Sequence, residues 1–110
     1  MRRAAAVLLA VGALAACAPD ALRRDPEFEQ WLREVRTDCE RARIGTTTVG
    51  RLLQSPASTE GGNFLNASSR LYAGRITADE WAQLILPFTR GRRDDPGVSC
   101  VLERVPKQPN

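Results

Sequence analysis

Apolar residues recur at helical spacing in three stretches of the chain. The first stretch predicts one amphipathic helix over residues 26–43, with an apolar stripe made of Phe28, Trp31, Leu32, Val35, Cys39 and Ala42. The second stretch spans residues 63–73, and the third begins at residue 78. A shorter apolar cluster at 49–53 predicts one or two more helical turns. The pattern therefore predicts a mainly α-helical domain with three to four helices.

Capping residues mark where the first two helices begin and end. Asp25 and Pro26 are typical of an N-cap followed by the first helical position, and Gly45 is a natural C-terminal stop. Asn63 is the expected N-cap of the second helix, and Gly74 is expected to end it.

The clearest local signal opens the third helix. Thr77-Ala78-Asp79-Glu80 has the form of a capping box, with Ile76 and Trp81 placed as a hydrophobic staple. Pro87 predicts that this helix kinks there or ends just before it. Residues 54–62, which are rich in Ser, Pro and Gly, are expected to form a mobile loop.

The C-terminal part shows a different period. The apolar residues Val98, Cys100 and Leu102 stand two positions apart, which predicts a short extended segment. A single strand cannot form a sheet, so this segment either packs on the helices or pairs with residues 46–49. Residues 105–110 are expected to be a disordered tail, and the helical domain is therefore predicted over residues 25–104.

The start of the chain resembles none of these segments. Two positive residues, Arg2 and Arg3, precede an unbroken run of thirteen apolar or glycine residues from Ala4 to Ala16. A helix that spans a bilayer needs about 20 residues, so this run is too short to span one. It fits the central region of a secretory signal peptide, which predicts an exported protein.

The residues that close this run carry a family resemblance. Leu14-Ala15-Ala16-Cys17 resembles the lipobox of bacterial lipoproteins, in which a branched apolar residue and two small residues precede an obligatory cysteine. The resemblance implies that residues 1–16 are removed as a signal peptide, that the Cys17 thiol receives a diacylglycerol, and that residues 17–24 form a lipidated tether. Each buried methylene contributes about 0.8 kcal/mol, so two or three acyl chains would anchor the protein stably. Because Ala18 rather than aspartate follows Cys17, the resemblance favours the outer membrane, facing the periplasm.

Three alternatives to the lipobox stay open. Ala16-Cys17-Ala18 also fits the A-x-A site of an ordinary signal peptidase, although Pro19 after the cut usually blocks that enzyme. An uncleaved membrane helix would need a longer apolar run. Arg2-Arg3 is also found in twin-arginine signals, but the residues after it lack that motif's pattern. We therefore prefer a lipidated Cys17.

Removal of residues 1–16 changes the charge and the cysteine count. The formal charge of +3 falls to +1, with 14 basic and 13 acidic side chains, so charge predicts no nucleic-acid partner. If lipid consumes Cys17, then Cys39 and Cys100 remain, and the oxidising periplasm favours one disulfide between them. This bridge would close a loop of about 60 residues and contribute roughly 4 kcal/mol by the chain-entropy estimate. We expect it to staple the C-terminal extended segment to the first helix.

Catalytic and metal-binding patterns are scarce in this sequence. The chain contains no His, which removes Cys-His and Ser-His pairs and the usual zinc sets, and no glycine-rich phosphate loop appears. We therefore predict no catalytic residue, no metal and no cofactor. Asp94-Asp95 lies in a Pro-Gly loop beside Arg92-Arg93, which is typical of a solvated turn rather than of catalytic or calcium-binding carboxylates. Arg90, together with Arg92-Arg93, is a weaker candidate for contacting anionic lipid head groups.

The large aromatic residues are the remaining candidate site. Trp31, Trp81 and Phe64 each lie in an apolar stripe, and such residues usually pack in a core. The alternative is that they line an exposed groove for a helix or strand of a partner. The apolar stripes together supply side chains for one thin core. Any side chains that line a groove would no longer be available to pack in this core.

Three functions follow from these observations. The first is a non-enzymatic interaction or assembly module, which a lipid holds at the outer membrane and which binds an envelope protein. Secretin pilotins are similar in general design, being small, lipidated and largely helical, although no residue carries over. The second is a periplasmic carrier or sensor that holds a small apolar ligand between the helices. The third, an enzyme built on Ser, Asp and Arg alone, has no motif in its favour.

Overall fold

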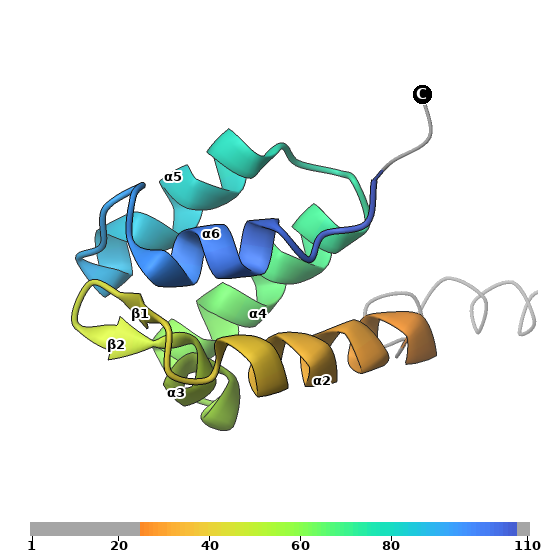
Figure 1. The fold of residues 1–110 in the computed structure, drawn as a ribbon, viewed down its shortest axis with the longest axis horizontal. Coiled ribbons are helices and arrows are strands. Elements are labelled where there is room, and N and C mark those ends of the chain that lie inside the picture. The colour runs from red at the N-terminus through yellow and green to blue at the C-terminus, as the bar shows by residue number, and fades with distance from the viewer. Residues whose placement is uncertain (1–24, 108–110) are drawn as a thin grey trace, which may run out of the picture.

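The computed structural model describes residues 25–107. Five helices and one two-stranded hairpin make up this part of the chain (Figure 1): α2 (Pro26–Cys39), β1 (Arg43–Ile44), β2 (Thr47–Thr48), α3 (Val49–Gln54), α4 (Thr59–Tyr72), α5 (Ala78–Thr89) and α6 (Pro96–Leu102). The prediction of a mainly helical domain is confirmed. Within the described residues, no helix is both long enough and apolar enough to cross a membrane.

Local capping signals place two of the helix starts as predicted. At the start of α2, the Asp25 carboxylate accepts a hydrogen bond from the Glu27 N–H at 2.9 Å. At the start of α5, Thr77 Oγ1 accepts from the Glu80 N–H at 3.1 Å, and Glu80 Oε1 accepts from the Thr77 N–H at 3.0 Å. The predicted capping box is therefore present, and it satisfies N–H groups that have no partner within the helix.

The second predicted helix begins earlier than expected. Ser58 rather than Asn63 is the N-cap of α4, and its hydroxyl accepts a hydrogen bond from the Gly61 N–H at 3.0 Å. Gly61 is buried, and a side chain there would collide with the backbone of Ser55. The loop expected over residues 54–62 is therefore shorter, because its second half is helical.

The first helix ends at Cys39, four residues earlier than predicted. The chain then forms the β1–β2 hairpin, in which Ile44 is fully buried. Gly45 makes the turn with a φ of 59°, a left-handed conformation that favours glycine, and a Cβ there would collide with the Thr89 carbonyl. Burial of Ile44 against the rest of the domain stabilises the hairpin over a longer helix.

The segment around Cys100, predicted to be extended, is the helix α6. Val98 and Val101, three positions apart, are both fully buried, and Gly97 packs so closely on Ile44 that a Cβ would collide with it. The prediction is wrong because a run of five residues fits both a strand and one face of a helix. The contact of α6 with β1 and α2 selects the helix. The segment also does not pair with residues 46–49, which belong to the hairpin and α3.

Helix α5 continues past Pro87 to Thr89. Of the two outcomes predicted at Pro87, a kink or an end just before it, the second is therefore wrong. The Thr89 hydroxyl donates a hydrogen bond to the Ile85 carbonyl at 2.9 Å inside this last turn. Arg90 then takes a left-handed conformation with a φ of 56° and ends the helix.

The helices enclose one hydrophobic core. Its buried members are Trp31, Val35, Cys39, Ile44, Val49, Leu52, Leu53, Phe64, Ala67, Leu71, Trp81, Ala82, Ile85, Val98 and Val101. The buried Ser68 hydroxyl accepts a hydrogen bond from the Trp81 indole N–H at 3.1 Å, and no buried side-chain N or O of the described residues lacks a partner. Val105, which the sequence places in the tail, packs against this core, so the packed domain extends past residue 104.

Candidate functional site

The three aromatic residues considered for a groove lie in the core. Trp81 is fully buried, Phe64 is 1% exposed and Trp31 is 5% exposed. The rings of Phe64 and Trp81 pack edge to face, with centroids 6.1 Å apart. The Trp31 indole N–H donates a hydrogen bond to the Arg104 carbonyl at 2.7 Å. The structure therefore places these side chains in core packing and not along an exposed groove.

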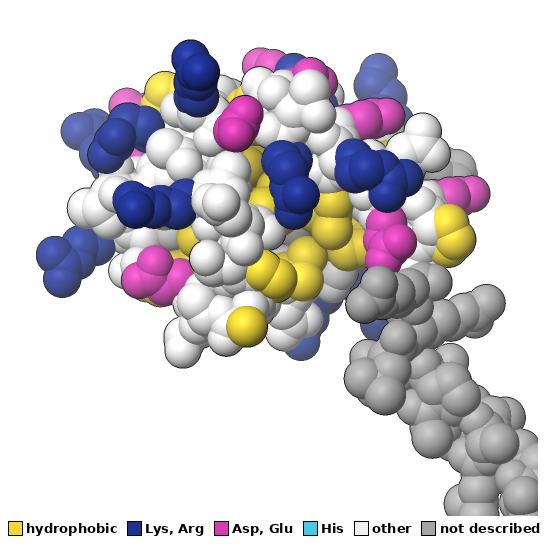
Figure 2. Space-filling view, turned by 90° about the horizontal axis from the view of Figure 1, so that it is seen from below, with side chains coloured by type: hydrophobic (Ala, Val, Ile, Leu, Met, Phe, Trp, Pro, Cys, Tyr) yellow, Lys and Arg dark blue, Asp and Glu magenta, His cyan; other side chains and the backbone are white. Residues whose placement is uncertain are grey.

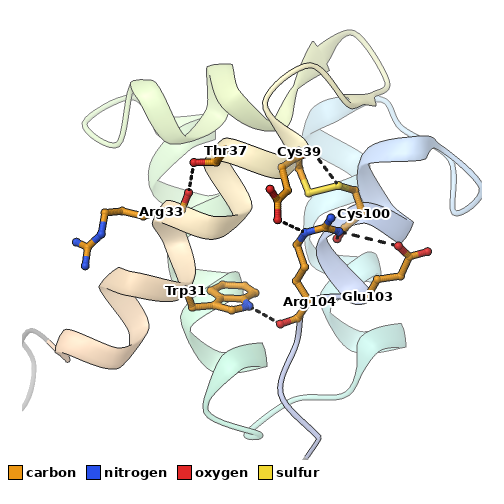
Figure 3. A network of polar contacts seen from close by, with 8 residues as sticks. Trp31, Arg33, Thr37, Cys39, Cys100, Glu103 and Arg104 are labelled. Carbon is orange, nitrogen blue, oxygen red and sulfur yellow. Dashed lines mark hydrogen bonds and ion pairs between the residues drawn. A yellow bond between two sulfur atoms is a disulfide. The ribbon is translucent and has the colours of Figure 1, made fainter.

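Cys39 and Cys100 form the predicted disulfide, with Cα atoms 5.9 Å apart. It joins the last residue of α2 to α6, as Figure 3 shows. Arg104 links the same two helices, because its Nε donates to the Asp38 carboxylate at 3.0 Å and its Nη1 donates to the Cys100 carbonyl at 2.7 Å. The disulfide and the Arg104 side chain thus together connect the end of α2 to α6. Cys17, the predicted lipidation site, lies outside the described residues.

The carboxylate of Asp95 belongs to a turn. Its Oδ2 accepts hydrogen bonds from the backbone N–H groups of Arg92 at 2.9 Å and Gly45 at 2.8 Å. These two bonds stabilise the charged form and lower the pKa of the Asp95 carboxyl. Through these two hydrogen bonds, Asp95 connects the hairpin turn to the loop before α6. The sequence does not reveal this role, because Gly45 and Asp95 stand 50 positions apart.

Two arginines of the same loop, Arg92 and Arg93, are paired with carboxylates. Arg92 Nε lies 3.3 Å from Asp94 Oδ1, and Arg93 Nη2 lies 3.5 Å from Asp79 Oδ1. All four side chains are at least half exposed, so solvent screens both pairs. These contacts reduce the positive charge that the loop offers to lipid head groups.

The surface of the described chain is hollowed beside the hairpin. The hollow has a volume of about 570 Å³ and is open to solvent. It is lined by residues at and just after the end of α2, in the hairpin and in α3: Arg36, Glu40, Arg41, Arg43, Thr46, Thr47, Thr48, Gly50, Arg51 and Gln54. This set is termed the arginine hollow. It contains none of the site residues predicted from the sequence.

Backbone contacts hold the walls of the arginine hollow together. Arg43 stands opposite Thr48 across the two strands. The Thr48 hydroxyl caps α3 by accepting a hydrogen bond from the Arg51 N–H at 3.2 Å. The Gly50 N–H donates to the Glu40 carbonyl at 3.0 Å, and a Cβ at Gly50 would lie only 2.7 Å from that oxygen. The backbone that carries the arginines is therefore fixed by hydrogen bonds between α2, the hairpin and α3.

Positive charge is concentrated at the arginine hollow. Its lining contains four Arg and one Glu, a net charge of +3. The described residues together carry 12 basic and 12 acidic side chains and so have no net charge. Figure 2 shows several Lys or Arg side chains at the end of the molecule where Figure 1 draws the hairpin. The hollow is a local positive site on a neutral domain.

Most of this charge is not neutralised by neighbouring side chains. Arg36 Nη2 donates a hydrogen bond to the Leu53 carbonyl at 3.2 Å. Within residues 25–107, the guanidinium groups of Arg41, Arg43 and Arg51 make no ion pair with a carboxylate. The hollow therefore presents charged hydrogen-bond donors that an external anion can use.

The opposite end of α2 is acidic and aromatic. The rings of Phe28, Trp31 and Tyr72 contact one another, with centroids 5.3 to 5.8 Å apart. Burial raises the pKa of the Tyr72 hydroxyl, and the charges of Glu27 and Asp25 raise this pKa further. A helix of 14 residues is about 21 Å long, so the acidic end of α2 and the arginine hollow are well separated.

No family model, curated protein or solved structure matches this chain. Among residues 25–107, no three His, Cys, Asp or Glu side chains gather in a group that could hold a metal ion. The arginine hollow is the feature of the described surface with the most distinctive chemistry.

Proposed function

We propose that this chain is a lipoprotein whose domain binds another protein of the cell envelope and performs no chemistry itself. The observation that carries the proposal is the arginine hollow, a concave and positively charged surface on a braced frame. Pockets for small ligands are mostly apolar and bury the ligand, whereas this hollow is polar and open. The lipid on Cys17 holds the domain at the outer membrane, where it faces the periplasm.

The disulfide supports the anchor part of the proposal. The chain has three cysteines, and Cys39 and Cys100 are bonded to each other, which leaves Cys17 as the third. An odd thiol is unusual in an exported protein, and lipidation of Cys17 would remove it. The apolar run and the small residues before Cys17 have the spacing of a lipobox.

A carrier of a small apolar ligand has less support. Trp31, Trp81 and Phe64, which would line its cavity, fill the core instead. The arginine hollow contains none of these side chains. We therefore prefer a protein partner to an apolar ligand.

Mass spectrometry of the protein isolated from membranes tests the anchor. We expect a chain that begins at Cys17, carries a diacylglycerol on the thiol, and sediments with outer-membrane fractions in a density gradient. The control variant Cys17→Ser should lack the lipid and leave the membrane fraction. An intact leader over residues 1–16, or a Cys17 with no fatty acid, would reject the anchor.

Crosslinking in intact cells tests the binding role. A photoreactive amino acid is placed at Gln54, which lines the arginine hollow, and separately at Arg75, which is exposed and outside it. We expect a discrete crosslink to an envelope protein from position 54 and none from position 75. Failure to crosslink from position 54, or the same products from both positions, would reject a partner at the hollow.

A further inference from the structure

The geometry of the arginine hollow restricts the chemistry of its occupant. Arg41 follows the end of α2, Arg43 lies on β1 and Arg51 lies on α3. The hollow is therefore lined by arginines from three parts of the fold. A guanidinium group is planar and donates two parallel hydrogen bonds to a carboxylate. The Thr47 side chain on β2 adds a neutral donor and acceptor beside them.

The shape of this surface favours a protruding chain over a bilayer. A flat lipid surface cannot enter a hollow of about 570 Å³, whereas an extended peptide segment can place several side chains in it. The hollow is also at the end of α2 that is remote from Asp25, the first described residue. A partner segment bound in the hollow is therefore well separated from the acidic end of α2.

We propose that the arginine hollow binds an acidic segment of a partner protein, whose carboxylates pair with Arg41, Arg43 and Arg51. The inference rests on the proposed function for the existence of a protein partner, and it adds the chemistry of the recognised segment. Glu40 lies in the same lining and makes no ion pair with an arginine among the described residues. Its charge opposes an acidic segment, so its removal strengthens binding.

Fluorescence anisotropy with a labelled peptide of eight glutamates measures this binding. The protein is the full chain, isolated from membranes in detergent. We expect saturable binding that weakens strongly between 0.1 M and 1 M salt, because the screening length falls from about 10 Å to about 3 Å. A peptide of eight glutamines is the neutral control and should not bind. Inorganic phosphate and glycerol phosphate, the latter representing a lipid head group, are tested as competitors.

Two matched double variants separate the hollow from net charge. Arg43→Glu with Arg51→Glu should weaken peptide binding at least about tenfold, since two attractive contacts become repulsive. Arg70→Glu with Arg75→Glu makes the same change in net charge at exposed arginines outside the hollow and should change binding less than about twofold. Circular dichroism and urea unfolding confirm that both variants fold.

The variant Glu40→Gln tests the proposal in the opposite direction. It keeps the shape of the side chain and removes a negative charge from the hollow, so the glutamate peptide should bind about two- to fivefold more tightly. This gain cannot arise from a folding defect. Weaker or unchanged binding would overturn the proposal.

Other outcomes are equally decisive. Equal losses in the two double variants would show that only net charge attracts the peptide and would overturn the proposal. Competition by phosphate or glycerol phosphate at the hollow, without binding of the glutamate peptide, would assign the hollow to a phosphate group and also overturn it. A specific crosslink from position 54 without glutamate-peptide binding would retain the proposed function and reject this chemistry. Peptide binding that depends on the hollow, without any crosslink in cells, would reject the envelope partner of the proposed function and retain the preference of the hollow for acidic segments.

Discussion

Replacement of both cysteines of the disulfide by alanine should remove a large share of the domain's stability. The bridge joins residues 61 positions apart, and α3, α4 and α5 all lie inside the loop that it closes. With the bridge intact, the unfolded chain is tied across most of the described domain. In the variant Cys39→Ala with Cys100→Ala the unfolded chain regains that freedom, which stabilises it relative to the folded state.

The chain-entropy relation sets the size of the effect. For a separation of 61 residues it gives about 4 kcal/mol at 25 °C. A change of 1 kcal/mol moves the thermal midpoint of a domain of this size by about 4–8 °C, so we expect a fall of roughly 16–32 °C. The ion pair between Arg104 and Asp38, 3.0 Å long, joins the same helices, but solvent reaches both side chains. It contributes at most about 1 kcal/mol and cannot replace the bridge.

Urea unfolding of the full chain in detergent, followed by circular dichroism, measures the loss. The wild type is compared with the alanine variant, each with and without a thiol reductant. Reduced wild type and variant should share one lowered free energy of unfolding, and the reductant should not affect the variant. The slope of the free energy against urea should rise, because an untied unfolded chain exposes more surface. A loss below about 1 kcal/mol would refute the entropic argument.

Three further variants test single contacts by urea unfolding. Gly45→Ala should cost at least about 1–3 kcal/mol, because it strains a left-handed turn and collides with the Thr89 carbonyl; a neutral effect would disprove the close approach. Ser68→Ala should cost about 1–3 kcal/mol, since it leaves the buried Trp81 indole N–H without its acceptor, and equal stability would contradict this account. Folding lowers the pKa of the Asp95 carboxyl. The contribution of this carboxylate to the free energy of unfolding is therefore fully present above its unfolded pKa of about 3.9, and it is lost as the pH falls through the folded pKa. Asp95→Asn should therefore be less stable than wild type at pH 7, and the difference in free energy of unfolding should shrink below about pH 4. A difference independent of pH would rule out stabilisation by the charged Asp95 carboxylate.

Local signals in the sequence correctly predicted the starts of α2 and α5. The Asp25 cap and the capping box of Thr77 and Glu80 involve residues two or three positions apart, so the contacts they make are readable from spacing alone. The start of α4 was harder to predict, because both Ser58 and Asn63 are good caps. Packing of Gly61 against the preceding turn selects Ser58, and that contact is not visible in the spacing.

The arginine hollow had only a weak signal in the sequence. Its arginines lie within residues 36–51, but the predicted helix over 26–43 would have carried three of them away from Arg51. The hairpin after Cys39 turns the chain back, and the Gly50 contact with Glu40 brings α3 against the end of α2. A density of arginines was therefore visible, and their convergence was not.

Spacing along the chain was sufficient for the helical class and for two helix caps. The choice of Cys39 and Cys100 as the bridged pair followed from the resemblance of Cys17 to a lipobox cysteine, and the lipid on Cys17 stays a prediction. Packing decided that α2 stops at Cys39, that residues 96–102 are helical, and that four arginines share one hollow. The reason is physical: caps and stripes depend on neighbours within about one helical turn. The other features depend on burial of Ile44 and on contacts between residues far apart in the chain, which only the folded domain brings together.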